Sequence, residues 1–513
     1  MARAGSILRN TFTVGAFTSL SRVLGLVREM MQSRLIGAGV AQSAFTLAFA
    51  IPNMARKLFG EGALTAAFVP VFRGEVERGG VEKAAKLARA VMTTVMLVLG
   101  AAVAFSLAGV LGASACAGRF GFSPRTRLAL SLVAILLPYM LAICGAAFGM
   151  GILNALGKFK ASSFMPALLN CIWISALGIL LFFPSISVES RIRFVAAAIL
   201  AGGFVQLAFM LAAVARAGVS PLPTFSGWGS EKLRLVWRNL GVAALGAGAV
   251  QVNYMLDQVL GQMAAPWAAG VIGYAERLMD LPLGVIGVAF GTVLLPTFSG
   301  LFAKGDMDSA RAALARSVNS LLFVMVPAAV GLAFLAQETV AAVYEGGEFD
   351  AAATVRVSRA LAVYAGGLCF FGFQKLLVPW FQAQNDMKTP LRVSLATVAL
   401  NAFLNILAVA LLPEEWRHVG LAASTVVCAA AGCVLLAAFA KRRNGPLGLS
   451  ACTLPLLRSA AASAAMACAI CLLRPRLASL PAIASLAAMI ASGMAAYFVS
   501  VALLGGRVRL RRS

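Results

Sequence analysis

Charged side chains inside long apolar runs are the residues of this sequence that could do chemistry. Seven of them are basic: Arg22, Arg28, Arg34, Arg56, Lys57, Arg277 and Lys375. Five are acidic: Glu29, Glu61, Asp257, Glu276 and Asp280. A charge at the centre of a bilayer costs about 2.5–3.5 kcal/mol, so such a set survives only by pairing, by lining a wet cavity or by binding a ligand. Because the cations outnumber the acids by two, the set predicts an anionic ligand.

The spacing of the first charges places them on two faces of one helix. Arg22 and Glu29 are seven residues apart and share a face, whereas Ser21 and Arg28 share another. Both faces could border one wide cavity, but they cannot form one narrow stripe.

The remaining basic residues differ in how well an acidic neighbour explains them. Lys57 and Glu61 are four residues apart, and Arg277 and Asp280 are three apart. These are the spacings of intrahelical ion pairs, so mutual neutralisation stays an alternative to ligand binding for both. Arg56 has no acidic residue three or four positions away. Its planar guanidinium suits bidentate recognition of a phosphate.

Asp257 is a solitary carboxylate in the middle of an apolar run. A carboxylate in that setting indicates a cation or proton site, or a counter-ion to one of the arginines. Lys375 is another candidate partner, and the sequence does not decide between these alternatives.

The sequence contains few residues or motifs that would support enzymatic catalysis. The only histidine, His418, lies in a gap between apolar runs, and HExxH, GxSxG and P-loop motifs are absent. The one CxxC, formed by Cys468 and Cys471, lies within a predicted span, so we interpret all nine cysteines as packing residues.

The elements that must position these residues are membrane-spanning helices. Of 513 residues 61% are hydrophobic and 12% charged, which excludes a cytosolic enzyme, a secreted disulfide scaffold and a disordered chain. The runs are continuous and lack the alternation of a β-barrel, so we expect an all-α integral membrane protein. Windows of about 20 apolar residues give fourteen spans, near 11–36, 41–70, 90–112, 128–156, 161–183, 194–215, 239–262, 268–300, 317–336, 357–384, 391–412, 419–440, 459–473 and 481–505.

Charge distribution predicts the topology. The net charge of +24 comes from 43 basic and 19 acidic residues, and the basic residues concentrate in short gaps between the spans. The positive-inside rule explains this excess better than nucleic-acid binding does. We therefore predict that both termini are cytoplasmic.

A weak internal repeat predicts the domain organisation. Segments 56–72 and 277–298 share an arginine, a glycine-punctuated run and a proline near the end, and six spans separate them. An even number of spans gives the two halves the same orientation, as in transporters that rock two lobes around a central cavity. We predict a six-helix lobe over 1–218, a second over 219–445, and two additional helices with a basic cytoplasmic tail over 446–513.

Five motifs resemble the MurJ (MviN) lipid II flippase family of the multidrug/oligosaccharidyl-lipid/polysaccharide exporter superfamily. The resemblance covers both lobes and extends to the count of fourteen helices. The motifs are SRVLGLVRE at 21–29, GAG at 37–39, IPNMARKLFGEGALTAAFVP at 51–70, YAERLMDLPLGVIGVAFGTVLLP at 274–296 and NDMKTP at 385–390.

The resemblance implies export of lipid II, the undecaprenyl-diphosphate-linked disaccharide-pentapeptide, across the cytoplasmic (inner) membrane of a bacterium for peptidoglycan and cell-wall biogenesis. It implies that four arginines bind the diphosphate and the peptide carboxylates: Arg22, Arg28, Arg56 and Arg277. Residues that could support them are Ser21, Glu29, Lys57, Glu61, Glu276, Asp280 and Lys375. The prenyl tail would lie in a groove that the last two helices help to shape. Membrane lipids and the cell-wall synthesis machinery are the other expected partners, and no cofactor is expected.

Three departures from the family pattern leave parts of the mechanism open. Ser43 stands where many members have aspartate, Lys57 where a second arginine is common, and Glu29 replaces an aspartate. Some members bind sodium between three helices, and Asp257 matches one of these helices, but its partners do not match clearly. Sodium coupling and drive by membrane potential therefore both remain open.

Three alternatives to a flippase also remain. One is an exporter of drugs or of another polysaccharide lipid, although an exporter of cationic drugs would need net negative charge at membrane depth. The others are a membrane scaffold without transport activity and a membrane-embedded glycosyl-lipid enzyme.

Overall fold

The fold is entirely α-helical. A computed structural model describes residues 2–58, 63–119, 121–226, 228–291, 293–477 and 479–505. These residues form seventeen α-helices and no β-strand, with one isolated bridge between Gly346 and Phe349. Each predicted span overlaps a helix, so the predicted class of all-α membrane protein is confirmed.

By length and composition, ten segments of the described residues are able to cross a membrane, so the chain is a multi-pass membrane protein. The segments are Ala67–Ala115, Pro124–Ala155, Phe159–Leu180, Val188–Arg216, Met307–Phe334, Ala351–Gln382, Lys388–Leu411, Glu414–Asn444, Leu449–Leu477 and Ala482–Leu503. The other four predicted spans correspond to helices α1, α2, α8 and α9, which carry most of the charged residues singled out above.

The chain divides into two compact units. The first is Met1–Gln262 with Gly346–Phe349, and the second is Met263–Glu345 with Asp350–Ser513. The division into three parts at 218 and 445 was inferred from the internal repeat, and it stays a prediction.

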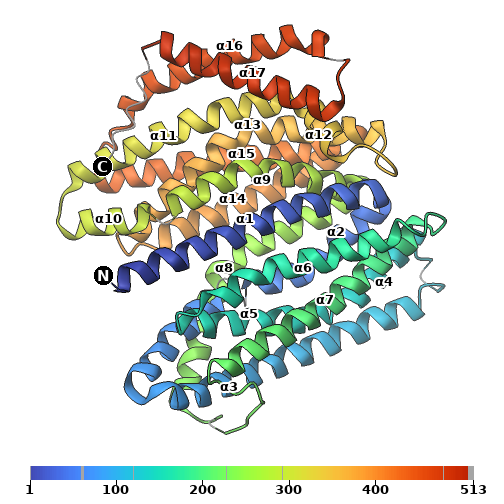
Figure 1. Ribbon diagram of the computed structural model, residues 1–513, viewed down its shortest axis with the longest axis vertical. Helices are drawn as coiled ribbons and strands as arrows, with labels where there is room; N and C mark the ends of the chain where they lie inside the picture. Colours follow the sequence, from blue (N-terminus) through green and yellow to red (C-terminus); the bar gives the residue numbers. More distant parts are fainter. Residues whose placement is uncertain are drawn as a thin grey trace. The chain divides into compact units, whose positions relative to one another are not determined.

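The first unit is a helical bundle (Figure 1). α1 packs on α6, α2 on α4, and α5 on both α3 and α7. Its helices are α1 (Ala2–Ile36), α2 (Val40–Ala55), α3 (Ala63–Ala115), α4 (Pro124–Leu136), α5 (Tyr139–Ala155), α6 (Phe159–Leu180), α7 (Val188–Arg216) and most of α8 (Glu231–Ala264).

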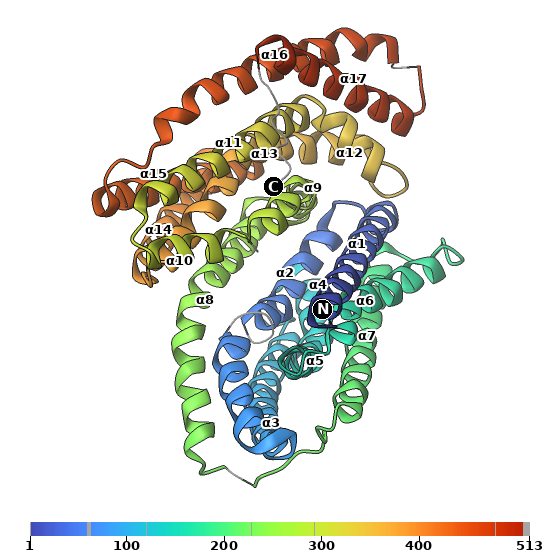
Figure 2. The same cartoon turned by 60° about the vertical axis from the view of Figure 1, so that its left-hand side comes forward.

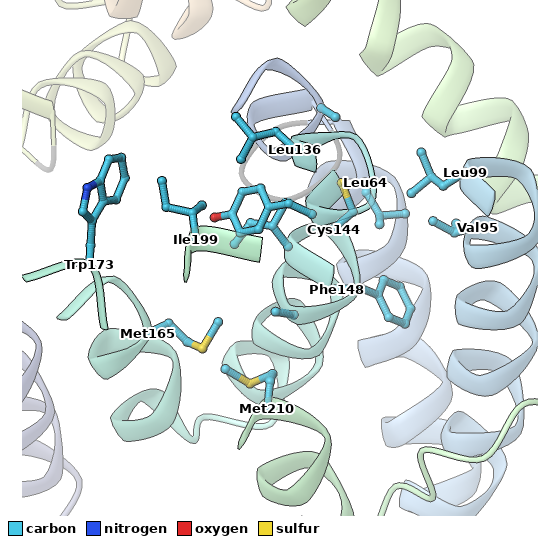
Figure 3. Packing of buried hydrophobic residues seen from close by; sticks show 14 of the residues in the cluster. Leu64, Val95, Leu99, Leu136, Cys144, Phe148, Met165, Trp173, Ile199 and Met210 are labelled. Carbon is cyan, nitrogen blue, oxygen red and sulfur yellow. The ribbon is translucent and has the colours of Figure 1, made fainter. Parts of the chain in front are cut away.

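Close helix packing organises the core of this unit. Leu136, Cys144, Phe148 and Met210 come from α4, α5 and α7 and pack together (Figure 3). At Gly203 of α7, a Cβ would lie 2.4 Å from the Tyr139 ring, so only glycine permits this approach.

The second unit is organised around α13. This helix packs against α9, α11 and α15, while α16 and α17 pair with each other and α16 also packs on α11 (Figure 1). The helices are α9 (Ala268–Gly291), α10 (Leu294–Ala303), α11 (Met307–Phe334), α12 (Ala336–Tyr344), α13 (Ala351–Gln382), α14 (Lys388–Leu411), α15 (Glu414–Asn444), the 3-10 turn η2 (Leu449–Cys452), α16 (Thr453–Leu477) and α17 (Ala482–Leu503).

Three predicted spans are not continuous helices. The 128–156 span is interrupted between α4 and α5 at Pro138, which lacks the N–H that a continuous helix needs. The 41–70 span contains the end of α2, followed by a π-helical turn over 56–58. The 268–300 span is divided between α9 and α10.

A glycine turn at the end of α1 closes tightly on the segment Gly346–Phe349. Gly37 has a φ of +76°, and a Cβ there would lie 2.4 Å from the carbonyl oxygen of Glu348. The backbone N–H of Glu348 donates to the carbonyl oxygen of Arg34 at 2.9 Å. Arg191 of α7 donates to the carbonyl oxygen of Leu35 and to the Glu348 carboxylate, each at 3.0 Å.

Gly37→Ala is expected to destabilise the first unit by about 2 kcal/mol, because a side chain at positive φ costs about 1–2 kcal/mol before any clash. Thermal unfolding in detergent measures the effect. The control is Gly109→Ala in α3, where a Cβ would meet no atom within 4 Å. Equal melting temperatures for the two variants would show that the tight turn is not required.

Candidate functional site

Arg28 is held by a set of polar and aromatic groups inside the first unit. Its guanidinium forms an ion pair with Glu29, and the two side chains are each 14% exposed. Nη1 donates to Oδ1 of Asn170 at 2.9 Å, and the guanidinium carbon lies 4.4 Å from the centre of the Trp173 ring. Asn170 in turn donates to the Ser21 carbonyl oxygen at 3.0 Å. The predicted shared face of Ser21 and Arg28 is therefore the face of α1 that meets α6.

Arg22 has a different environment from Arg28. Its side chain is exposed and borders a cavity of about 310 Å³ formed by α1, α5 and α6. Hydroxyl and amide groups line the same cavity: Thr18, Ser21, Asn154, Ser162 and Ser163. A guanidinium beside several hydrogen-bonding groups is a setting that suits an anionic ligand.

Arg56 and Lys57 lie at the end of α2. Arg56 donates through Nε and Nη2 to Oδ1 of Asn53, at 3.3 and 3.1 Å. The Lys57 ammonium lies 4.9 Å from the centre of the Tyr254 ring of α8, in the geometry of a cation–π contact. Glu61, the predicted ion-pair partner of Lys57, lies outside the described residues.

The candidate residues of α9 belong to the second unit. Arg277 and Asp280 are both exposed. Glu276 is half-buried, and its carboxylate accepts a hydrogen bond from the hydroxyl of Tyr364 at 3.4 Å. Lys375 on α13 is exposed and donates to the carbonyl oxygen of Leu283 at 3.5 Å.

Asp257 is half-buried on α8, one helical turn from an amide. Nδ2 of Asn253 donates to its carboxylate at 3.2 Å. Within the described residues, no three His, Cys, Asp or Glu side chains come together as metal ligands. Sodium binding at Asp257 therefore stays a prediction.

Ser43, which stands where many family members have aspartate, is contacted by the side-chain amide of Gln262. Nε2 of Gln262 donates to the Ser43 hydroxyl at 3.0 Å, and Oε1 of Gln262 accepts from Arg125 at 2.6 Å. These contacts join α2, α4 and α8 without an acidic side chain at position 43.

His418 is fully buried and has a structural role. Its Nε2 lies 3.1 Å from the carbonyl oxygen of Arg356, and its ring packs edge-on against Trp267 at 4.9 Å. This environment leaves the ring no access to a substrate.

Sequence reasoning missed the uncharged partners of the cations. Asn170 and Trp173 on α6 hold Arg28, Asn53 holds Arg56, and Tyr254 contacts Lys57. Asn170 did carry a usable signal, because an amide within an apolar span is costly unless it is hydrogen-bonded.

Comparison with known proteins identifies the family. A family model described as lipid II flippase MurJ matches residues 32–491. A probable lipid II flippase MurJ of Rhizobium tropici is 32% identical over 413 residues, 80% of this chain and 77% of that protein. The lipid II flippase MurJ of Burkholderia cenocepacia is 31% identical over 444 residues, 84% of this chain and 83% of that protein.

Solved structures show the same fold. A lipid II flippase MurJ in an inward closed conformation aligns with a TM-score of 0.77 at 22% identity, over 96% of this chain and 98% of that one. An inward-facing multidrug resistance MATE transporter of the MOP superfamily aligns with a TM-score of 0.67 at 15% identity, over 83% of this chain and 95% of that one. From the match over 32–491 and the curated relatives, the chain belongs to the lipid II flippase MurJ family.

Proposed function

We propose that this protein is a lipid II flippase, a transporter rather than an enzyme, which moves the lipid-linked precursor from the inner to the outer leaflet by alternating access. Family membership supports the substrate and the activity. The observation that carries the proposal is the pair of α1 arginines, which occupy two different polar environments within the first unit.

The chemistry of these arginines suits a diphosphate. A guanidinium offers parallel N–H donors that match two phosphate oxygens. Arg28 is oriented by Glu29 and Asn170, so little conformational entropy would be lost on binding. Arg22 borders an open polar cavity with hydroxyl groups beside it. We assign the first contact with the diphosphate or the peptide carboxylates to Arg22, and Arg56 and Arg277 complete the proposed set.

An apolar cavity in the second unit suits part of the prenyl tail. It has a volume of about 380 Å³ and is lined by residues of α9, α11, α12, α16 and α17, among them Pro327, Gly331, Met466 and Met494. An isoprenoid chain has no hydrogen-bonding groups, so a lining of aliphatic and aromatic side chains meets its requirements.

Gly331→Leu is expected to lower lipid II transport several-fold by filling this cavity. A Cβ at Gly331 would lie 3.7 Å from the Met466 methyl group, an ordinary contact, so the fold should tolerate the change. The control is Gly100→Leu on α3, where a Cβ would meet no atom within 4 Å. Equal transport by both variants, measured in proteoliposomes, would show that the cavity does not hold the tail.

Orientation and coupling complete the proposal. The basic gaps between spans favour cytoplasmic N- and C-termini in the bacterial inner membrane. Asp257 with Asn253 offers oxygen ligands for sodium, and membrane potential is the alternative energy source. We also propose that the flippase works beside the cell-wall synthesis machinery, which uses its product.

Movement of fluorescent lipid II between leaflets of proteoliposomes tests the function. We expect lipid II to move between leaflets only in proteoliposomes that contain the protein. Adding a cationic drug should not slow this movement. Conversion of lipid II into a new product without leaflet exchange would favour the glycosyl-lipid enzyme. Failure of the gene to rescue cells depleted of their own flippase would also count against the proposal.

A further inference from the structure

A linker joins α7 to α8 in the first unit, and it is fastened to α3. We use linker for residues 217–226 and 228–230, which pass beside the middle of α3 before α8 begins (Figure 2). Nε of Arg89 donates to the carbonyl oxygen of Leu222 at 2.9 Å, and the backbone N–H of Thr224 donates to Oγ1 of Thr93 at 2.9 Å. The linker is therefore held at the level of residues 89–93 of α3.

That level is the start of the uncharged, membrane-spanning part of α3. Arg89 is the last charged residue of α3, and the 26 residues after it, up to Ala115, carry no charge. A helix rises 1.5 Å per residue, so this run is about 39 Å long and covers a whole hydrocarbon core. Leu222 and Thr224 lie beside the beginning of this run, where a helix that spans the bilayer would enter the headgroup layer.

The linker exposes three large apolar side chains at this level. Leu222 and Phe225 are 65% exposed and Trp228 is 48% exposed. The rings of Phe225 and Trp228 meet edge-on at 5.1 Å, so they form one apolar surface. These residues stand outside the spans, because α7 ends at Arg216 and α8 begins with Glu231. In water their exposure would be unfavourable, whereas tryptophan is enriched in the interfacial layer of a bilayer.

Basic residues flank the linker on α7 and α8. Arg216, Arg234 and Arg238 are exposed at the adjoining ends of α7 and α8. Lys232 is paired with Glu75 of α3 at 2.5 Å, so its charge is partly neutralised, whereas Arg89 adds a further positive charge where it contacts the linker. Anionic phospholipid headgroups complement such a surface, because basic residues near the membrane are attracted to their negative charge.

We propose that the linker is an interfacial anchor for anionic phospholipid. Leu222, Phe225 and Trp228 insert at the boundary between headgroups and acyl chains, and Arg234 and Arg238 bind phosphate groups of the same leaflet. The anchor fixes the membrane depth at which α8 begins. The occupant is lipid rather than a soluble protein because the apolar side chains lie level with the start of an uncharged span.

Depth-dependent quenching of Trp228 fluorescence in nanodiscs tests the anchor. Because the chain has six tryptophans, the fluorescence of Trp228 is obtained by subtracting the fluorescence of Trp228→Phe from that of the wild type. Phosphatidylcholine brominated near the glycerol end of its chains should quench this signal about twofold more than lipid brominated near the chain ends, as expected for an interfacial ring. Quenching by aqueous acrylamide but by neither lipid would overturn the proposal and indicate a surface for a soluble partner.

The charge requirement is tested in the same assay. Adding phosphatidylglycerol should increase quenching by the shallow bromines, and the double variant Arg234→Gln with Arg238→Gln should lose this increase. The matched control is Arg316→Gln with Arg392→Gln, two exposed arginines of the second unit, which should keep it. Equal quenching with and without phosphatidylglycerol would show that the anchor does not select anionic lipid.

Discussion

Arg28→Ala is expected to reduce lipid II transport by about a hundredfold or more and to lower the stability of the first unit. The side chain makes three interactions at once: the ion pair with Glu29, the hydrogen bond to Asn170 and the stacking on Trp173. Removing one partner of a buried pair leaves the other charge uncompensated, which typically costs about 3 kcal/mol or more. Transport in proteoliposomes and thermal unfolding measure the two effects.

A second substitution separates binding from folding. Glu29→Gln combined with Arg28→Ala removes the uncompensated carboxylate, so stability should return toward the wild-type value while transport stays low. Arg28→Lys keeps the charge but cannot reproduce the planar contact with Trp173 and the two directed donors, so we expect it to transport poorly as well. If the double variant transported lipid II at the wild-type rate, Arg28 would have only a structural role.

Arg22→Ala is expected to abolish most lipid II binding without changing the unfolding temperature. Its side chain is exposed and borders an open cavity, so its removal leaves no void in the packed core of the first unit. Arg22→Lys should retain part of the activity, because an ammonium keeps the attraction but loses bidentate geometry, a loss of about tenfold.

Arg316→Ala is the matched control for Arg22, since Arg316 is an exposed arginine of α11 in the second unit and does not line the cavity beside Arg22. It should bind and transport lipid II like the wild type. A loss of the same size in both variants would mean that net positive charge, rather than the cavity beside Arg22, determines binding.

The positions of the charges along α1 were predictable from the sequence, whereas their partners were not. The helical period places Ser21 and Arg28 on one face, and both side chains indeed meet Asn170. Asn170 is 142 residues from Arg28 in the chain, and no local pattern links the two positions. The same limit applies to Lys57 and Tyr254, which lie on helices of different sequence regions.

The positions of the helices were also predictable from the sequence, whereas the breaks within them were not. Hydrophobic length located each span, because a membrane fixes how many apolar residues a helix needs. The interruptions were harder to foresee, since hydropathy continues through Pro138 and through the end of α2 while the backbone does not. The replacement of an acid by Ser43 was visible, but the compensating amide of Gln262 comes from a helix 219 residues away in sequence.

Lipid II binding measured by native mass spectrometry tests the central claim most directly, namely that arginines held at membrane depth recognise the diphosphate. We predict that the wild type and Arg316→Ala retain one lipid II molecule, that Arg22→Ala and Arg28→Ala lose it, and that excess inorganic pyrophosphate displaces it from the wild type. Retention of lipid II by both arginine variants, together with no displacement by pyrophosphate, would contradict the account.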